Sequence, residues 1–185
     1  MPLEIKNSDR LSYALMTEND ADLLFELDRN PEVMRYINGG TPSTRDEIEN
    51  IYIPRMMSYR DPIKGWGIWG VTLTNICEFI GWILVRPMNF FNEQRNDEDL
   101  ELGWRFKQTA WGQGYATEAA TTVLNALEAS GTHQFTAIAD EANIASTNLM
   151  KRLGMKYVKT GLHKDPLGDA MVVYYCRKVA SKKIR

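Results

Sequence analysis

The sequence contains little of what indicates an extracellular or metal-dependent protein. Its 185 residues include two cysteines, Cys77 and Cys176, and two histidines. A disulfide framework or a zinc site needs more of these residues at closer spacing, so we expect reduced thiols and no bound metal. No signal peptide is recognisable at the start, and no apolar run reaches the roughly 18 residues that span a bilayer. We therefore expect a cytoplasmic protein.

An excess of charge of one sign is also missing. The chain has 22 Lys and Arg against 24 Asp and Glu, which gives a formal net charge of -2 at pH 7. This balance does not call for a nucleic acid or a membrane surface as partner, and we expect neither. The one basic cluster is the C-terminal SKKIR at residues 181–185, which we interpret as a frayed terminus.

The length and the order of the hydrophobic patterns predict a single α/β domain over residues 1–185. Apolar, β-branched and aromatic runs predict strands over 11–16, 66–73, 78–85, 100–106, 135–140, 155–162 and 171–177. Capping residues and helical spacing predict helices over 17–28, 30–38, 43–59, 115–129 and 145–153. We expect one mixed sheet with helices packed against it, and a β-bulge at Gly103.

Gly112 and Gly114 stand directly before the longest predicted helix, in the stretch TAWGQGYATEAATT at residues 109–122. Glycine inside a helix costs about 1 kcal/mol relative to alanine, so the pair indicates a tight turn or a close backbone approach to a ligand. Unpaired amides at a helix start bind anions. Neither the Walker pattern nor the dinucleotide fingerprint GxGxxG matches, because Thr117 stands where the last glycine is needed. On the residues alone, a plain turn and a phosphate loop both stay open.

WGQGYATEA, preceded by ELGWRFKQTA, resembles the acetyl-CoA pyrophosphate loop of the GNAT acetyltransferases, whose pattern is Gln/Arg-x-x-Gly-x-Gly/Ala. Trp111 departs from the first position, a departure that is familiar in the branch resembling the Rim-type N-acetyltransferases of ribosomal proteins. ANIASTNLMKRLGMKYV at residues 142–158 is similar to that branch's NxxSxxxxxKxGF segment, and GWGIWGVTL with CEFIGWILV resembles its second and third strands. The resemblance implies the GNAT fold, a mostly antiparallel mixed sheet whose strands at 100–106 and 135–140 splay apart.

The same resemblance implies acetyl-CoA as co-substrate. The residues that would hold its pyrophosphate are Trp111, Gly112, Gln113, Gly114, Tyr115, Ala116 and Thr117. The backbone of Trp104, Arg105 and Phe106 would pair with the pantetheine arm, and an amide near Trp104 or Arg105 would polarise the thioester. Asn143 and Asn148 resemble the positions at which the family contacts coenzyme A, and Lys151 would approach the adenosine phosphates. For Lys151, a solvated helix face is an equal alternative.

Two side chains are candidate catalytic residues. Glu101 is the expected general base, acting directly or through water, because related enzymes carry a carboxylate at this place; a solvent-facing strand position is the alternative. Many GNAT enzymes place a tyrosine acid where this chain has Met150, which cannot donate a proton. Ser146 is therefore the expected acid for the leaving thiolate, with a helix cap as its alternative role. We expect His163 to be a surface histidine.

The resulting hypothesis is an acetyl-CoA-dependent N-acetyltransferase that acts on a primary amine. The Rim-type branch favours a protein N-terminal α-amine. A small-molecule amine (an amino acid, a polyamine or an antibiotic) is the second hypothesis, and a non-catalytic acyl-CoA-binding sensor is the third. Whether the protein forms a homodimer is left open by the sequence.

Overall fold

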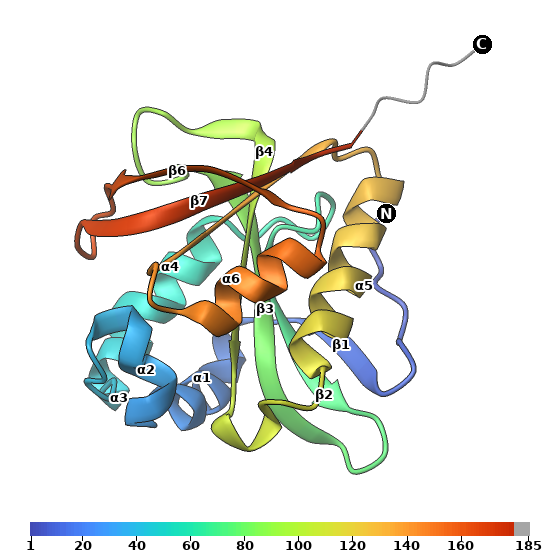
Figure 1. The fold of residues 1–185 in the computed structure, drawn as a ribbon. Helices are drawn as coiled ribbons and strands as arrows, with labels where there is room; N and C mark the ends of the chain where they lie inside the picture. Colours follow the sequence, from blue (N-terminus) through green and yellow to red (C-terminus); the bar gives the residue numbers. More distant parts are fainter. Residues whose placement is uncertain (180–185) are drawn as a thin grey trace.

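The sheet of this protein has seven strands. A computed structural model describes residues 1–179, and the basic C-terminal cluster lies outside this part (Figure 1). The strand order is β1-β2-β3-β4-β5-β7-β6, antiparallel at every pairing except the parallel contact of β4 with β5. The strands are β1 (Leu11–Leu15), β2 (Gly67–Leu73), β3 (Glu78–Met88), β4 (Asn96–Phe106), β5 (Gln134–Ala139), β6 (Lys156–His163) and β7 (Ala170–Lys178).

Helices cover both faces of this sheet (Figure 1). The long helix α5 (Tyr115–Ala129) and α6 (Ile144–Arg152) pack on one face, where the larger core cluster lies. The other face carries α1 (Ala21–Asp28), α2 (Pro31–Asn38), α3 (Arg45–Glu47) and α4 (Ile53–Ser58), which close the smaller core cluster. The predicted mixed sheet flanked by helices is confirmed.

The helix predicted over residues 43–59 is present from Arg45 to Ser58, but it is not α-helical throughout. It divides into α3, a π-helical segment (Ile48–Tyr52) and α4. Pro54 has no amide hydrogen and cannot complete an α-helical ladder, and the neighbouring amide of Ile53 donates to the carbonyl of Ile48, five residues back. The start matches the prediction, since Thr44 and Glu47 form a capping box.

The strand that was predicted to begin at residue 100 begins at Asn96, and its bulge is not at Gly103. Gly103 pairs regularly with Leu84, and the register of β3 and β4 shifts instead between Pro87 and Met88. A Cβ at position 103 would lie 3.3 Å from the Leu84 side chain. Close cross-strand packing therefore explains this glycine, and the expectation of a bulge was wrong.

Strands β4 and β5 pair only briefly. Their ladder consists of Leu100 with Phe135 and Glu101 with Thr136, after which β4 continues to Phe106 and β5 to Ala139 without pairing to each other. The splay expected between these strands is thus confirmed, although a bulge at Gly103 does not cause it. A gap lined by unpaired backbone opens inside the sheet.

Gly81 fixes the course of β4 along this gap. A Cβ at Gly81 would lie 2.4 Å from the carbonyl oxygen of Arg105 and 2.7 Å from the Cα of Phe106. We predict that Gly81→Ala lowers the free energy of unfolding by about 1–3 kcal/mol, because β4 must move away from β3. Urea denaturation measures this loss. The control is Gly161→Ala on β6, where a Cβ meets nothing within 4 Å; equal effects of the two variants would contradict the prediction.

Candidate active site

The gap between β4 and β5 presents backbone amides of β4 that have no strand partner. Lys107 donates its amide to the carbonyl of Ile80 at 2.8 Å, so the backbone groups of Arg105 and Gly103 point toward β3 by alternation. The amides of Trp104 and Phe106 therefore point into the gap. Of the two residues expected to polarise a thioester, Trp104 fits this alternation and Arg105 does not.

The loop between β4 and α5 turns through two left-handed glycines. Gly112 has φ +72° and Gly114 has φ +78°, values that residues with a Cβ rarely adopt. Trp111 is half-exposed and donates its indole N–H to the carbonyl of Phe106 at 2.9 Å, which ties the loop to the end of β4. The predicted loop residues therefore lie directly beside the gap.

The first turn of α5 has free amides. No side chain caps this helix, and the amide of Glu118, which donates to the carbonyl of Gly114 at 3.0 Å, makes the first bond of its ladder. The preceding helical residues, Tyr115, Ala116 and Thr117, direct their N–H groups outward at the positive end of the helix dipole. Loop and helix start together form a place suited to a phosphate group.

The Glu101 side chain points to the face of β4 opposite α5 and α6, and it is buried. Its carboxylate accepts from Nε of Arg86 at 2.8 Å and from Nη2 at 3.2 Å, and the two residues are direct cross-strand partners. Its exposure of 5% rules out the alternative of a solvent-facing strand residue. Burial acts to lower the pKa of Arg86, but the charge and hydrogen bonds of Glu101 outweigh it and raise that pKa.

Aromatic and charged groups surround this ion pair. The Arg86 guanidinium lies 5.6 Å from the ring centroid of Tyr59 and 5.4 Å from that of Phe91. Burial raises the pKa of Tyr59 to about 12. Arg55 of α4 stacks on Phe91 and pairs with Asp165 of the β6–β7 turn. This pair joins the helical layer to the end of the sheet beside Glu101.

Strand β7 approaches Glu101 from the other side. Burial, and then the charge of Glu101, raise the pKa of Tyr174. The hydroxyl of Tyr174 lies 3.2 Å from Nδ1 of His163, which is 8% exposed. The expectation that His163 is a surface histidine was therefore wrong: it ends β6 with its ring turned toward Tyr174.

Ser146 lies across the gap from β4. Its hydroxyl oxygen accepts from Nε1 of Trp104 at 3.1 Å, so a side chain of β4 and one of α6 meet over the gap. The cap of α6 is Asn143, whose side-chain oxygen accepts from the amide of Ser146 at 3.1 Å. The alternative role of Ser146 as a cap is thus excluded, and its hydroxyl hydrogen is available. Met150 is fully buried in the core.

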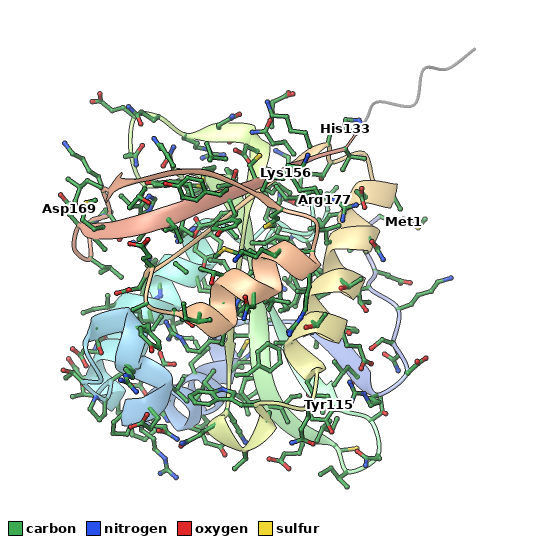
Figure 2. The ribbon with its side chains drawn as sticks, in the orientation of Figure 1. Met1, Tyr115, His133, Lys156, Asp169 and Arg177 are labelled. Atoms are coloured by element: carbon green, nitrogen blue, oxygen red, sulfur yellow. The ribbon has the colours of Figure 1, made fainter. Side chains whose placement is uncertain are left out.

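The other predicted residues of α6 are less closely associated with the loop. Asn148 and Lys151 are both exposed. Lys151 lies in the last turn of α6, where Arg177 donates to the carbonyl of Leu153 and to Glu128 in the last turn of α5. Figure 2 shows Tyr115 at the start of α5 and Arg177 near its other end. Since α5 has 15 residues and rises about 22 Å, these contacts of Arg177 lie at the end of α5 away from the loop, and the role of Lys151 stays a prediction.

Sequence reasoning missed Arg86 and the ion pair between Arg105 and Asp28. Arg86 is the only charged residue between Phe79 and Met88, and an isolated charge in an apolar strand signals a buried partner. The Arg105 side chain bonds Asp28 at the end of α1 at 2.6 Å, so it faces the helical layer and not the gap. No local sequence signal connects these two positions.

Comparison with known proteins identifies the family and the fold. The family model described as the acetyltransferase (GNAT) domain matches residues 10–156. The chain belongs to this family. Within residues 1–179, this GNAT acetyltransferase has no cluster of three His, Cys, Asp or Glu side chains placed to hold a metal ion. None of the helices described there has the length and apolar character needed to cross a membrane.

Three relatives illustrate the family. The chain is 28% identical to the FsC-acetyl coenzyme A-N(2)-transacetylase of Aspergillus fumigatus, over 84% of this chain and 66% of that protein, slightly under two thirds of its length. It is 30% identical to the uncharacterized protein YkkB of Bacillus subtilis, over 83% of this chain and 86% of that one. RimL, a ribosomal alpha-N-protein acetyltransferase solved with coenzyme A, superposes with a TM-score of 0.71 at 14% identity, over 95% and 97% of the two chains. At that identity the likeness shows the fold and not the branch.

The buried ion pair gives a test of this geometry. We predict that Arg86→Met lowers the free energy of unfolding by about 3–5 kcal/mol, because Glu101 is left buried without its partner. Replacing both residues, Arg86→Met with Glu101→Gln, restores most of the loss. Urea denaturation measures both variants. Arg95→Met is the control, since the pair of Arg95 with Asp97 is exposed and contributes at most about 1 kcal/mol; an equally small effect at Arg86 would contradict the buried pair.

Proposed function

We propose that this GNAT acetyltransferase transfers the acetyl group of acetyl-CoA to a primary amine. The observation that carries the proposal is the gap between β4 and β5, which ends at the uncapped start of α5. A pantetheine arm carries amide groups of its own, and β4 offers it the unpaired amide of Phe106, which leaves the amide of Trp104 for the thioester. The pyrophosphate then rests on the amides that follow Gly112 and Gly114.

The acceptor reaches the thioester from the opposite face of β4. Leu102, Trp104 and Phe106 face the core beneath α5 and α6, whereas Glu101 and Arg105 face the helical layer of α1 to α4. Donor and amine therefore approach one strand from two sides. Holding both in place removes the entropic cost of a bimolecular encounter.

Glu101 takes the proton that the amine must lose. As the amine nitrogen attacks the thioester carbonyl, a C–N bond forms, and the proton passes to the carboxylate directly or through one water. Arg86 occupies one acceptor direction on each carboxylate oxygen, which leaves lone pairs free and fixes the carboxylate in one orientation. The amide of Trp104 stabilises the negative charge that develops on the carbonyl oxygen.

Ser146 returns a proton to the leaving group. When the C–S bond breaks, the thiolate of coenzyme A needs a donor at the gap. The Ser146 oxygen already accepts from Trp104, so the hydroxyl gives its hydrogen to the sulfur while it takes one from solvent water, and Glu101 releases its proton to solvent. Ser146 then acts as the acid in this chain, in place of the tyrosine that many GNAT enzymes carry at the position of Met150.

A groove next to Glu101 supports a peptide as acceptor. Its volume is about 660 Å³, and it runs over β5, β7 and β6. Thr136, the direct strand partner of Glu101, lines it together with Tyr174 and Cys176. Lysines at its rim (Lys156, Lys159 and Lys178) favour acidic residues behind the reacting amine. We therefore propose a protein N-terminal α-amine as acceptor, in keeping with the Rim-type resemblance.

A small-molecule amine is the second candidate. The observation that favours it is the likeness to the FsC-acetyl coenzyme A-N(2)-transacetylase, whose name assigns its reaction to an N(2) atom of FsC. In either case we propose a single domain over residues 1–185 that works in the cytoplasm. The exposed, unpaired thiol of Cys77 supports a reducing compartment.

The two catalytic assignments predict a defined kinetic pattern. Glu101→Gln lowers kcat by about a hundredfold or more, and Ser146→Ala by about tenfold, because each removes one proton transfer. The KM for acetyl-CoA changes less than threefold in both. Thiol release during steady-state turnover measures these values.

The control for this pattern is Glu98→Gln, since Glu98 is an exposed carboxylate on the same strand. Melting temperatures establish that the variants are folded. If the Glu101→Gln variant is folded at the assay temperature and keeps its kcat, Glu101 is not the base. If Ser146→Ala keeps its kcat, another group protonates the thiolate.

A panel of amines tests the acceptor. Peptides with a free N-terminus and acidic residues at their second and third positions are expected to have a KM at least tenfold lower than the same peptides with lysines there. Matched peptides with a blocked N-terminus are inert. If only amino acids, polyamines or aminoglycosides are turned over, the acceptor is a small molecule and not a peptide. If acetyl-CoA raises the melting temperature but no amine releases thiol, the protein is a sensor, and no shift at millimolar acetyl-CoA overturns the whole proposal.

A further inference from the structure

Arg10 lies over the start of α5, although it precedes β1 in the chain. Its Nε donates to Glu118 at 2.7 Å, and its Nη1 donates to the carbonyl of Gln113 at 3.0 Å. The guanidinium lies 4.4 Å from the ring centroid of Tyr115. Three contacts thus fix this cation against the glycine loop and the first helical turn.

The anchor for Arg10 is itself held in place. Glu118 also accepts from the Ser8 hydroxyl at 2.7 Å and from the Arg10 amide at 2.9 Å. Burial acts to raise the pKa of Glu118, but these hydrogen bonds and the charge of Arg10 outweigh it and lower that pKa. The carboxylate is therefore charged at neutral pH and sets the orientation of the guanidinium.

One nitrogen of Arg10 is left for a ligand. Within residues 1–179, Nη2 has no hydrogen-bond partner, and a Cβ built on Gly114 would lie 3.5 Å from it. The side chain is 46% exposed, and this nitrogen lies beside Gly114 at the start of the free amides. A phosphate bound to those amides would therefore lie near this nitrogen.

The loop supplies no such donor itself. Trp111 stands where the family pattern has Gln or Arg, and its one polar atom is bound to the carbonyl of Phe106. The side-chain nitrogen of Gln113 donates to the carbonyl of Thr109 at 3.0 Å. Arg10 thus brings to the loop, from another part of the chain, a charged donor that Trp111 and Gln113 do not provide.

We propose that Arg10 binds the pyrophosphate of acetyl-CoA through Nη2, while Nε and Nη1 keep the guanidinium in place. This assignment rests on the proposed function, because it takes acetyl-CoA as the ligand of the loop. The bond is charge-assisted and aimed at a fixed oxygen, so its loss weakens binding of any donor that carries the nucleotide. A donor without the nucleotide is unaffected.

The test compares two donors and two products. Arg10→Ala is expected to raise the KM for acetyl-CoA, and the Kd of coenzyme A measured by calorimetry, by at least tenfold. The KM for S-acetylpantetheine and the Kd of pantetheine, which both lack the pyrophosphate, change less than twofold. Arg10→Lys recovers only part of the affinity for coenzyme A, since lysine keeps the charge but lacks the rigid fork whose separate nitrogens bind Glu118, Gln113 and a phosphate.

Two further variants separate phosphate binding from a structural role. Lys6→Ala removes one exposed positive charge from the same segment and is expected to leave every value unchanged. Glu118→Gln keeps the charge of Arg10 but removes the carboxylate that anchors it. This variant is expected to raise the Kd of coenzyme A by less than Arg10→Ala does. Equal losses for coenzyme A and pantetheine would assign Arg10 to loop structure alone, and unchanged coenzyme A affinity would also overturn the proposal. Absence of turnover in the wild type, with coenzyme A still bound more weakly by Arg10→Ala, would contradict the proposed function and not this inference.

Discussion

The two-residue ladder between β4 and β5 is the constraint on which the rest of the site depends. A sheet with complete hydrogen bonding would leave no room for a ligand, because each amide of a central strand has a partner. Here the ladder ends at Glu101 and Thr136, and the next amides of β4 have no partner on β5. The loop at the far end of β4 leads directly into α5, so the gap and the helix start meet.

Strand β4 also separates two chemical environments. Alternate side chains of a strand point to opposite faces of the sheet. Residues 101–106 therefore supply both the side chains beneath α5 and α6 and those that face the helical layer of α1 to α4. The apolar face of β4 packs into the core beneath α5, and its other face carries Glu101 and Arg105, each paired with a charge from another element. These pairs keep charged groups in a mostly buried region without leaving either member uncompensated.

Much of this arrangement follows from local sequence. The strands, most of the helices and the glycine loop have strong local signals, such as the capping box at Thr44 and the glycine pair before α5. Arg86 and Asp28, the ion-pair partners of Glu101 and Arg105, have no local sequence signal of this kind. They reach their partners only through the sheet register and the packing of the helices. The bulge at Gly103 was predicted wrongly for the same reason: a glycine in a strand indicates close packing or a bulge, and only the neighbouring Leu84 decides which.

The splayed strands have a thermodynamic consequence. Their unpaired amides and carbonyls form two sheet edges inside the protein, and backbone groups that lack partners cost free energy in the folded state. A ligand that completes these edges binds the native chain and not the unfolded one, so stability increases with the logarithm of its concentration above the dissociation constant. Folding and the binding of acetyl-CoA are then linked equilibria, in which the ligand-free native state is less stable toward unfolding than the ligand-bound one.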